Sequence, residues 1–382
     1  MKKSVIIVLA VLSLLSCPPT GEPPSPAPPI AFGDPVQFPH QGPMVWDGAN
    51  YAIAWGADDG AGPVVHFQQF SAAGTPIGSP LAVYEYGASV HFGYFIQLVW
   101  TGQEYAVFWR CGVNYGISMA RISRDGQLAG GPYQITTPSR LSNTRLDYEV
   151  AWTGAEFGVA WYDKGPSDTV GGSVKLTRVG SGGSVVGELD YGHYEYFGGP
   201  NKPAIAGSGD GFAVCWVADI SRLLAASTVG GGPHELANLS STCMEIELVS
   251  VGADYGLIWT SATGDLSLLL LDSSCAEKGA AIVVNDMSSP SVIWTGQEFV
   301  MSACDYEIYT ICASMWRWGD DVHFVRFDKT GKVLQDTCID IAAEYPCLVW
   351  RNPGYAVGYW KELIDYQSCG TTGYTFALKE SK

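Results

Sequence analysis

The chain has 382 residues, including 46 glycines, 22 prolines and 13 tryptophans, while Asp, Glu, Lys and Arg together make up only 15%. A composition rich in glycine and aromatic residues favours many short strands joined by tight turns over helices. The formal net charge of −17 argues against nucleic-acid binding, which needs a basic surface, and against adhesion of the domain surface to anionic lipid.

The first sixteen residues are laid out like an export signal. Lys2 and Lys3 supply a positive start, and residues 4–15 form an almost wholly apolar run that is too short to span a bilayer. The run leads into Leu-Leu-Ser-Cys17, which resembles the lipobox of bacterial lipoproteins. That resemblance implies a signal peptide over residues 1–16 and a diacylglyceryl group on the Cys17 thiol. The plainer alternative is an ordinary signal peptide with a chance cysteine.

Residues 17–30 are expected to form a linker. The stretch 18–29 is rich in proline and has no apolar side chain larger than alanine, so it predicts an extended, semi-rigid spacer that joins no core. In the Gram-negative lipoproteins that this chain resembles, Asp after the lipidated cysteine implies inner-membrane retention, and Pro18 stands there instead. We therefore expect an exported protein held in the cell envelope by the lipid on Cys17 alone. The outer membrane is favoured, and the periplasmic side and the cell surface both remain open.

A ten-residue motif recurs along residues 31–382. Its first copy reads Trp-Asp-Gly-Ala-Asn-Tyr-Ala-Ile-Ala-Trp, with a turn glycine followed by an aromatic residue. The spacing of roughly 50 residues is typical of the blades of a β-propeller. The copies begin at Trp46, Trp100, Trp152, Gly207, Ser250, Trp294 and Trp350.

Each copy predicts a β-hairpin whose return strand has two different faces. The turn glycine can adopt the positive φ that a tight hairpin needs. In the second copy Tyr105, Val107 and Trp109 fall on one face of the return strand. Ala106 and Phe108 fall on the other, and in most copies this second face is small. A bulky face opposite a small one suits sheets that pack on one another, so we expect the repeat tryptophans to lie in the core.

A third strand follows in most copies, and a short fourth strand closes the unit. The last copy stops after its third strand, residues 374–378, while residues 34–38 read as a strand without a partner. We therefore predict an all-β, seven-bladed β-propeller of four-stranded blades, closed by an N-terminal strand that completes the last blade. A pair of β-sandwiches and a β-solenoid are the alternatives.

The motif resembles the Trp-x-Gly-x-x-Tyr/Phe repeats of β-propeller lipoproteins from myxobacteria-like bacteria. The resemblance covers almost all of residues 31–382. It implies the fold and export, and it implies no activity, because propellers host unrelated functions.

One face of the predicted propeller carries the long loops, and function tends to reside in such loops. These loops are rich in aromatic and acidic residues, which suit a sugar or a protein partner. The alternative is that the rings only pack the loops against one another. The binding candidates are Trp316, Trp318, Tyr306, Tyr309, Tyr194, Tyr196, Tyr94 and Tyr366.

Nine cysteines besides Cys17 are compatible with an oxidising compartment, and their odd number leaves at least one unpaired within the chain. Their spacing shows no metal-binding pattern. The candidate disulfides would staple loops and blade junctions. They are Cys304–Cys312, Cys338–Cys347, Cys215–Cys243 and Cys111–Cys369.

No catalytic signature appears in the sequence: it has no GxSxG, HExxH or P-loop motif. We predict neither a metal nor a cofactor, and the acidic pair Asp320–Asp321 is expected to be solvated. His66 and His323 occupy equivalent third-strand positions, which a structural role explains.

Three functions remain open. The favoured one is an envelope-anchored binding scaffold, a monomeric domain that presents one face to a protein or glycan. The second is a glycosidase- or lyase-type enzyme with a pair of acids in an axial pocket, and the third is a structural envelope protein. Two carboxylates about 5–10 Å apart in a deep axial pocket would favour the enzyme.

Overall fold

The computed structural model describes fourteen stretches of the chain. Side chains are not described for part of the later strands. The predicted signal peptide, Cys17, the linker and the strand at residues 34–38 lie outside the described residues. The stretches are residues 44–58, 62–86, 95–110, 116–136, 148–163, 171–194, 202–218, 222–238, 243–261, 264–312, 315–340, 343–351, 354–365 and 370–381.

The described strands form antiparallel sheets in which each strand pairs with its neighbours in the sequence. The first three blades each have four strands. Blade 1 is β1 (Met44–Trp46), β2 (Asn50–Asp58), β3 (Pro63–Ser71) and β4 (Pro76–Glu85). Blade 2 is β5 (Phe95–Trp100), β6 (Glu104–Arg110), β7 (Ile117–Ser123) and β8 (Leu128–Gln134). Blade 3 is β9 (Tyr148–Trp152), β10 (Glu156–Asp163), β11 (Gly172–Gly180) and β12 (Val185–Tyr194).

The later strands continue the same order. Blade 4 is β13 (Ala204–Ser208), β14 (Gly211–Ala218), β15 (Arg222–Ser227) and β16 (Gly231–Asn238). Blade 5 is β17 (Cys243–Val251), β18 (Asp254–Ser261), β19 (Asp265–Leu271) and β20 (Ile282–Asp286). Blade 6 is β21 (Ser288–Trp294), β22 (Phe299–Cys312), β23 (Met315–Phe327) and β24 (Val333–Asp340). The terminal sheet is β25 (Ala343–Trp350), β26 (Tyr355–Asp365) and β27 (Gly370–Ser381).

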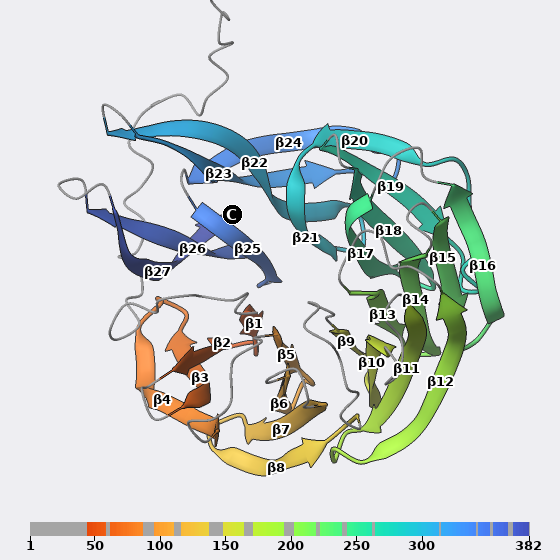
Figure 1. The fold of residues 1–382 in the computed structure, drawn as a ribbon, viewed down its shortest axis with the longest axis horizontal. Coiled ribbons are helices and arrows are strands. Elements are labelled where there is room, and N and C mark those ends of the chain that lie inside the picture. Colours follow the sequence, from red (N-terminus) through yellow and green to blue (C-terminus); the bar gives the residue numbers. More distant parts are fainter. Residues whose placement is uncertain are drawn as a thin grey trace, which may run out of the picture.

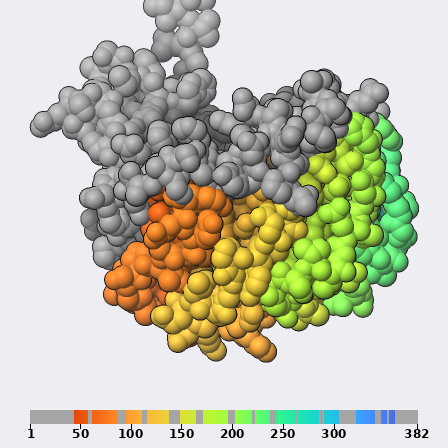
Figure 2. Space-filling view, turned by 60° about the horizontal axis from the view of Figure 1, so that its bottom comes forward, coloured from red at the N-terminus to blue at the C-terminus, as the bar shows by residue number. Residues whose placement is uncertain are grey.

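The sheets stand around a common axis as in a β-propeller (Figure 1). The first strand of each sheet lies nearest the axis and the last strand lies at the rim. Blades 1 to 3, from orange to green, stand side by side along the rim in Figure 2. Among the described residues no helix is long and apolar enough to cross a membrane.

The prediction of seven four-stranded blades is wrong. Six sheets have four strands, whereas the terminal sheet β25–β27 has three, because no described strand pairs with the outer edge of β27. The terminal sheet instead contacts blade 1 through side chains: Val349 and Ala356 share a core cluster with Met44 and Tyr51. Packing between these two sheets therefore joins the two ends of the described chain.

The hairpin turns follow from the Thr-Gly pair of the repeat. In blade 2 the Thr101 side chain accepts the amide hydrogen of Glu104 at 3.0 Å and donates to the Glu104 carbonyl at 2.8 Å. Gly102 adopts a φ of 92°, which a side chain would disfavour. Thr153 and Thr295 repeat these bonds in blades 3 and 6. The turns therefore confirm the predicted hairpins.

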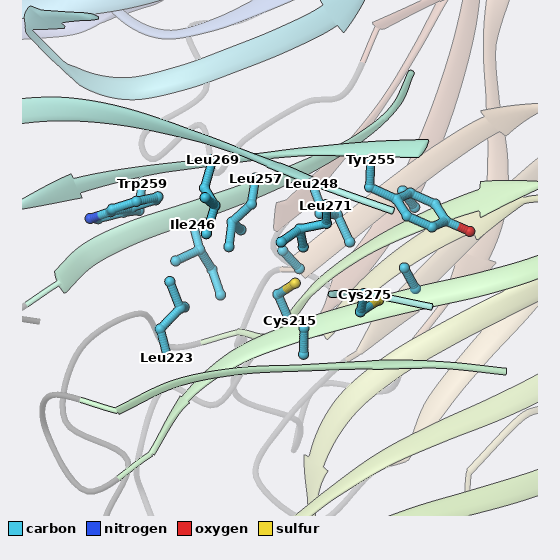
Figure 3. Close-up of a cluster of buried hydrophobic side chains, with 14 of the residues drawn as sticks. Cys215, Leu223, Ile246, Leu248, Tyr255, Leu257, Trp259, Leu269, Leu271 and Cys275 are labelled. Atoms are coloured by element: carbon cyan, nitrogen blue, oxygen red, sulfur yellow. The ribbon is translucent and has the colours of Figure 1, made fainter. Parts of the chain in front are cut away.

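The core lies between neighbouring blades, as the two-faced strands predict. Trp109 and Trp216 are fully buried, and the small face of each strand lets the next blade approach closely. A Cβ at Gly158 would lie 2.6 Å from the Phe212 ring of the next blade. Figure 3 shows such a cluster between blades 4 and 5, where Cys215 packs among leucines.

The predicted long loop at residues 304–321 is largely absent. β22 and β23 instead continue their pairing out to Cys312 and Met315. The polar and aromatic residues that alternate in this segment are compatible with two paired strands, because such residues tolerate a half-exposed pleated surface.

Candidate functional site

The described structure places only part of the predicted binding set. Tyr94, Tyr196 and Tyr366 lie outside the described residues. Tyr306, Tyr309, Trp316 and Trp318 lie on the β22–β23 hairpin, where the backbone pairs Tyr306 with Asp320 and Trp318 with Ile308. The hairpin therefore brings these four positions together along one ladder, although they are separated in the sequence by a turn.

The Tyr194 side chain packs within the protein. Its ring centroid lies 5.9 Å from that of Trp216, and Tyr191 stacks on the same indole at 5.5 Å. Tyr84 of blade 1 stacks at 5.8 Å on Trp109 of blade 2, whose Nε1 donates to the Tyr86 hydroxyl at 2.8 Å. These four tyrosines therefore extend the core and hold their segments against the repeat tryptophans.

A charged cluster that sequence reasoning missed lies on the inner strands. Glu149 on β9 and Glu247 on β17 occupy equivalent positions, three residues before the start of the repeat motif in blades 3 and 5. Blade 4, between them, has Ala204 at this position. Lys202 lies two residues before Ala204, so the small alanine leaves room for the lysine beside it. Alignment of the repeats by their inner strands would have revealed the matching glutamates.

Lys202 bridges the two carboxylates. Its Nζ lies 3.2 Å from Oε2 of Glu149 and 3.3 Å from Oε1 of Glu247. The cluster thus links blade 3 to blade 5 across the inner strand of blade 4. Because these blades are not neighbours, the link passes on the axial side of the ring. We call Glu149, Lys202 and Glu247 the axial cluster.

Burial and mutual charge shift the proton affinities of the axial cluster. Burial, and then the charge of Glu247, raise the pKa of Glu149 to about 8, although Lys202 opposes the shift. Burial alone would lower the pKa of Lys202, but the two glutamates outweigh it and raise that pKa. Lys202 is therefore charged at neutral pH, and Glu149 holds its proton far above the usual range of a carboxyl group.

The arrangement is unlike a glycosidase pair. Such enzymes place two carboxyl groups about 5–9.5 Å apart with the scissile bond or a water between them. Here the Lys202 ammonium lies within 3.3 Å of an oxygen of each carboxylate. It therefore occupies the space that the reacting groups would need.

The cysteines do not pair as predicted. Cys304 and Cys312 lie on the same strand, β22, eight residues apart, and an extended strand separates such Cα atoms by roughly 26 Å. A disulfide needs about 4.4–6.8 Å, so the predicted pair is wrong. Cys111 and Cys369 lie outside the described residues.

Two further predicted pairs are also wrong. Cys215 and Cys243 lie in the same apolar cluster but are free, and Cys347 is free on β25. Burial raises the pKa of the Cys243 and Cys347 thiols to about 12, so these groups are unreactive packing residues. Cys275 is a further free cysteine among the described residues.

One group of metal-ligating residues is found in the described part of the chain. Asp321, His323 and Cys338 place ligand atoms within 4.8 Å of one another, and Asp321 is buried on β23 rather than solvated as expected. Nδ1 of His323 is hydrogen-bonded to Asp336 at 2.8 Å, and Cys338 is disulfide-bonded. A sulfur held in a disulfide is no thiolate ligand. We therefore assign no metal to this group.

No protein-family model and no curated protein matches the chain. Solved structures match through their fold. BBS1N in complex with ARL6DN has a TM-score of 0.51 at 8% identity, with 91% of this chain and 93% of that chain covered. A chain of the mitotic checkpoint complex has a TM-score of 0.50 at 11% identity, with coverage of 94% and 97%.

A third similar structure is apo AztD from Citrobacter koseri, with a TM-score of 0.43, 13% identity and 86% of each chain covered. At these identities the likeness concerns the fold alone. The described sheets and these similarities together identify the fold of the chain as a β-propeller.

Proposed function

We propose that the protein is a binding scaffold of the cell envelope, anchored by a lipid on Cys17, which presents the long-loop face of its propeller to a protein or glycan. The supporting observation is the axial cluster. Lys202 forms close contacts with both inner-strand glutamates and fills the space between them. This leaves the paired acids without room for a substrate and favours recognition over hydrolysis.

The β22–β23 hairpin is the proposed recognition element. It extends the two strands of blade 6 well beyond their pairing with β21 and β24. Its sequence offers Tyr306, Tyr309, Trp316 and Trp318, and such aromatic residues dominate binding energy at interfaces with proteins and stack on sugar rings.

A test uses the full chain on a glycan array and in titrations with purified candidate envelope proteins. We expect saturable binding that the double variant Trp316→Ala/Trp318→Ala weakens by at least about tenfold, since aromatic anchors each contribute about 2 kcal/mol or more. Trp350→Ala is the matched control, because Trp350 is an exposed tryptophan at the opposite, short-turn end of an inner strand. Loss of binding only in the control variant would contradict the proposal.

The enzyme alternative is tested separately by incubating the chain with chromogenic glycosides. We expect no turnover. Hydrolysis that is lost in the Glu149→Gln variant would show that the protein is a glycosidase rather than a binding scaffold.

A further inference from the structure

A cavity of about 350 Å³ lies between blades 2 and 3 beside their short turns. The blade 2 wall includes Thr101, Glu104 and Arg121. The blade 3 wall includes Trp152, Ser181 and Gly182. The cavity lies on the opposite face of the propeller from the proposed recognition hairpin, so it concerns a different site.

The turn that carries Ser181 repeats in other blades with the same backbone geometry. In blade 2 the Ser123 amide donates to the Gln127 carbonyl at 2.8 Å, and the Gly126 amide donates to the Ser123 carbonyl at 2.9 Å. The bonds of residues 180–184 and 328–332 have the same pattern, and each turn has a glycine of positive φ in fourth place. Ser181, Arg124 and Lys329 are therefore equivalent second residues of their turns.

In blades 2 and 6 this second residue is a cation that covers the repeat tryptophan. Cζ of Arg124 lies 5.7 Å from the Trp100 ring centroid, and Nζ of Lys329 lies 4.8 Å from that of Trp294. Both distances are within the range of a cation–π interaction. The protein's own repeats thus show which chemical group fits over this ring.

In blade 1 a residue outside this turn supplies the cation over the repeat tryptophan. Its turn has Ala72 in second place, and the ring of Trp46 is covered instead by Arg351 of the terminal sheet at 5.0 Å. Two unrelated positions therefore supply a cation to the same kind of ring. The repeated element is the cation over the ring rather than a particular residue in the turn.

Blade 3 is the exception. Ser181 and Gly182 stand where the turn of blade 2 has Arg124 and Asp125, and none of the cation–ring contacts of the described residues involves Trp152. A Cβ added at Gly182 would meet nothing within 4 Å. The cavity is thus the space that a cationic side chain fills elsewhere.

The opposite wall offers acceptors. In blade 1, Asp47 accepts a hydrogen bond from Arg124 through its carbonyl at 3.2 Å, and Thr101 is its equivalent beside the cavity. Glu104 also lines this space, and its carboxylate accepts two hydrogen bonds from Arg121, at 2.8 and 3.0 Å. The net charge of −17 attracts cations to such a site.

We propose that the cavity over Trp152 binds a guanidinium or alkylammonium group from outside the chain, stacked on the indole as Arg124 is on Trp100. The group can belong to a free organic cation or to an arginine or lysine side chain of a partner. The recognition chemistry is the same for both sources.

The test is calorimetric titration of the full chain with Nα-acetyl-arginine amide and with its neutral isostere, Nα-acetyl-citrulline amide. We expect binding of the arginine compound, at least about tenfold tighter than that of the citrulline compound. Trp152→Leu should weaken it by about tenfold. Trp294→Leu is the matched control, because Lys329 already covers that ring, and should leave the affinity unchanged.

Two reciprocal variants test the repeat argument. Ser181→Arg should fill the cavity and abolish binding, while Arg124→Ser should uncover Trp100 and raise the stoichiometry by one. Equal affinity for arginine and citrulline, or unchanged binding by a folded Ser181→Arg variant, would overturn the proposal. So would a preference for a methyl glycoside that depends on Trp152.

A final arm distinguishes the two sources of the cation. It compares Nα-acetyl-arginine amide with an acetylated Gly-Arg-Gly amide. Tighter binding of the tripeptide assigns the site to a partner's side chain, and equal binding assigns it to a free cation.

Discussion

The axial cluster and the cavity over Trp152 both arise where blades depart from the repeat, with opposite results. At the axis, the departures in blades 3, 4 and 5 complement one another, because Lys202 lies between Glu149 and Glu247. Beside Trp152, the departure removes a cation that other blades supply, and an open space remains. In this propeller a change in one blade is compensated where neighbouring blades change with it, and a change without such compensation indicates where a ligand can bind.

The largest effect is expected from breaking the axial cluster. Lys202→Met removes the cation shared by the two glutamates and should lower the free energy of unfolding by about 3–5 kcal/mol, the cost of leaving a buried charge without its partner. Chemical denaturation followed by tryptophan fluorescence measures this change.

The control for this prediction restores charge balance. The triple variant Lys202→Met/Glu149→Gln/Glu247→Gln should recover most of the lost stability, since replacing a whole buried ion cluster is often close to neutral. If the triple variant is as unstable as Lys202→Met, the lysine acts through packing rather than charge.

An intermediate effect is expected from pH. The pKa of Glu149 is about 8 in the folded chain against 4.5 as its ordinary value, so the folded state binds this proton more tightly than the unfolded state. Its contribution to stability is therefore present at low pH and is lost as pH rises from about 4.5 through about 8. Between pH 5 and pH 8 we expect this group to reduce the free energy of unfolding by about 3 kcal/mol.

Two variants assign the pH effect to its source. Glu149→Gln should remove this part of the pH dependence, and Glu247→Gln should move it to lower pH, because the repulsion that raises the pKa of Glu149 is lost. An unchanged pH profile in both variants would show that the effect comes from elsewhere.

The smallest effect is expected at the tryptophan rings. Ser181→Arg should raise the free energy of unfolding by about 0.5–1 kcal/mol by adding a cation–π contact over Trp152. Lys329→Ser should lower it by a similar amount by uncovering Trp294. Urea midpoints measure both, and a Ser181→Arg variant less stable than Lys329→Ser would contradict the equivalence of the two turns.

Much of the fold was predictable because the same pattern of turn and strand residues recurs along the chain. Three features were expected on local physical grounds and are found in the structure. They are the Thr-Gly turn at Thr101, the two-faced strand around Trp109 and the small residue Gly158. The number of complete blades was predicted wrongly, because pairing at the outer edge of a sheet depends on distant residues rather than on the repeat. The disulfides were also predicted wrongly, because spacing along the chain does not show that Cys304 and Cys312 lie on one extended strand.

The local pattern of residues is sufficient to specify β-hairpins with one bulky and one small face, since turn chemistry and alternation act over a few residues. Which departures from the repeat meet in space depends on how the blades are arranged around the axis. Lys202 lies 53 residues after Glu149 and 45 before Glu247, and only the circular arrangement of the blades brings the three together. The same arrangement places Ser181 beside Trp152 and opposite Glu104, because contacts between blades depend on how the sheets pack rather than on the order of residues.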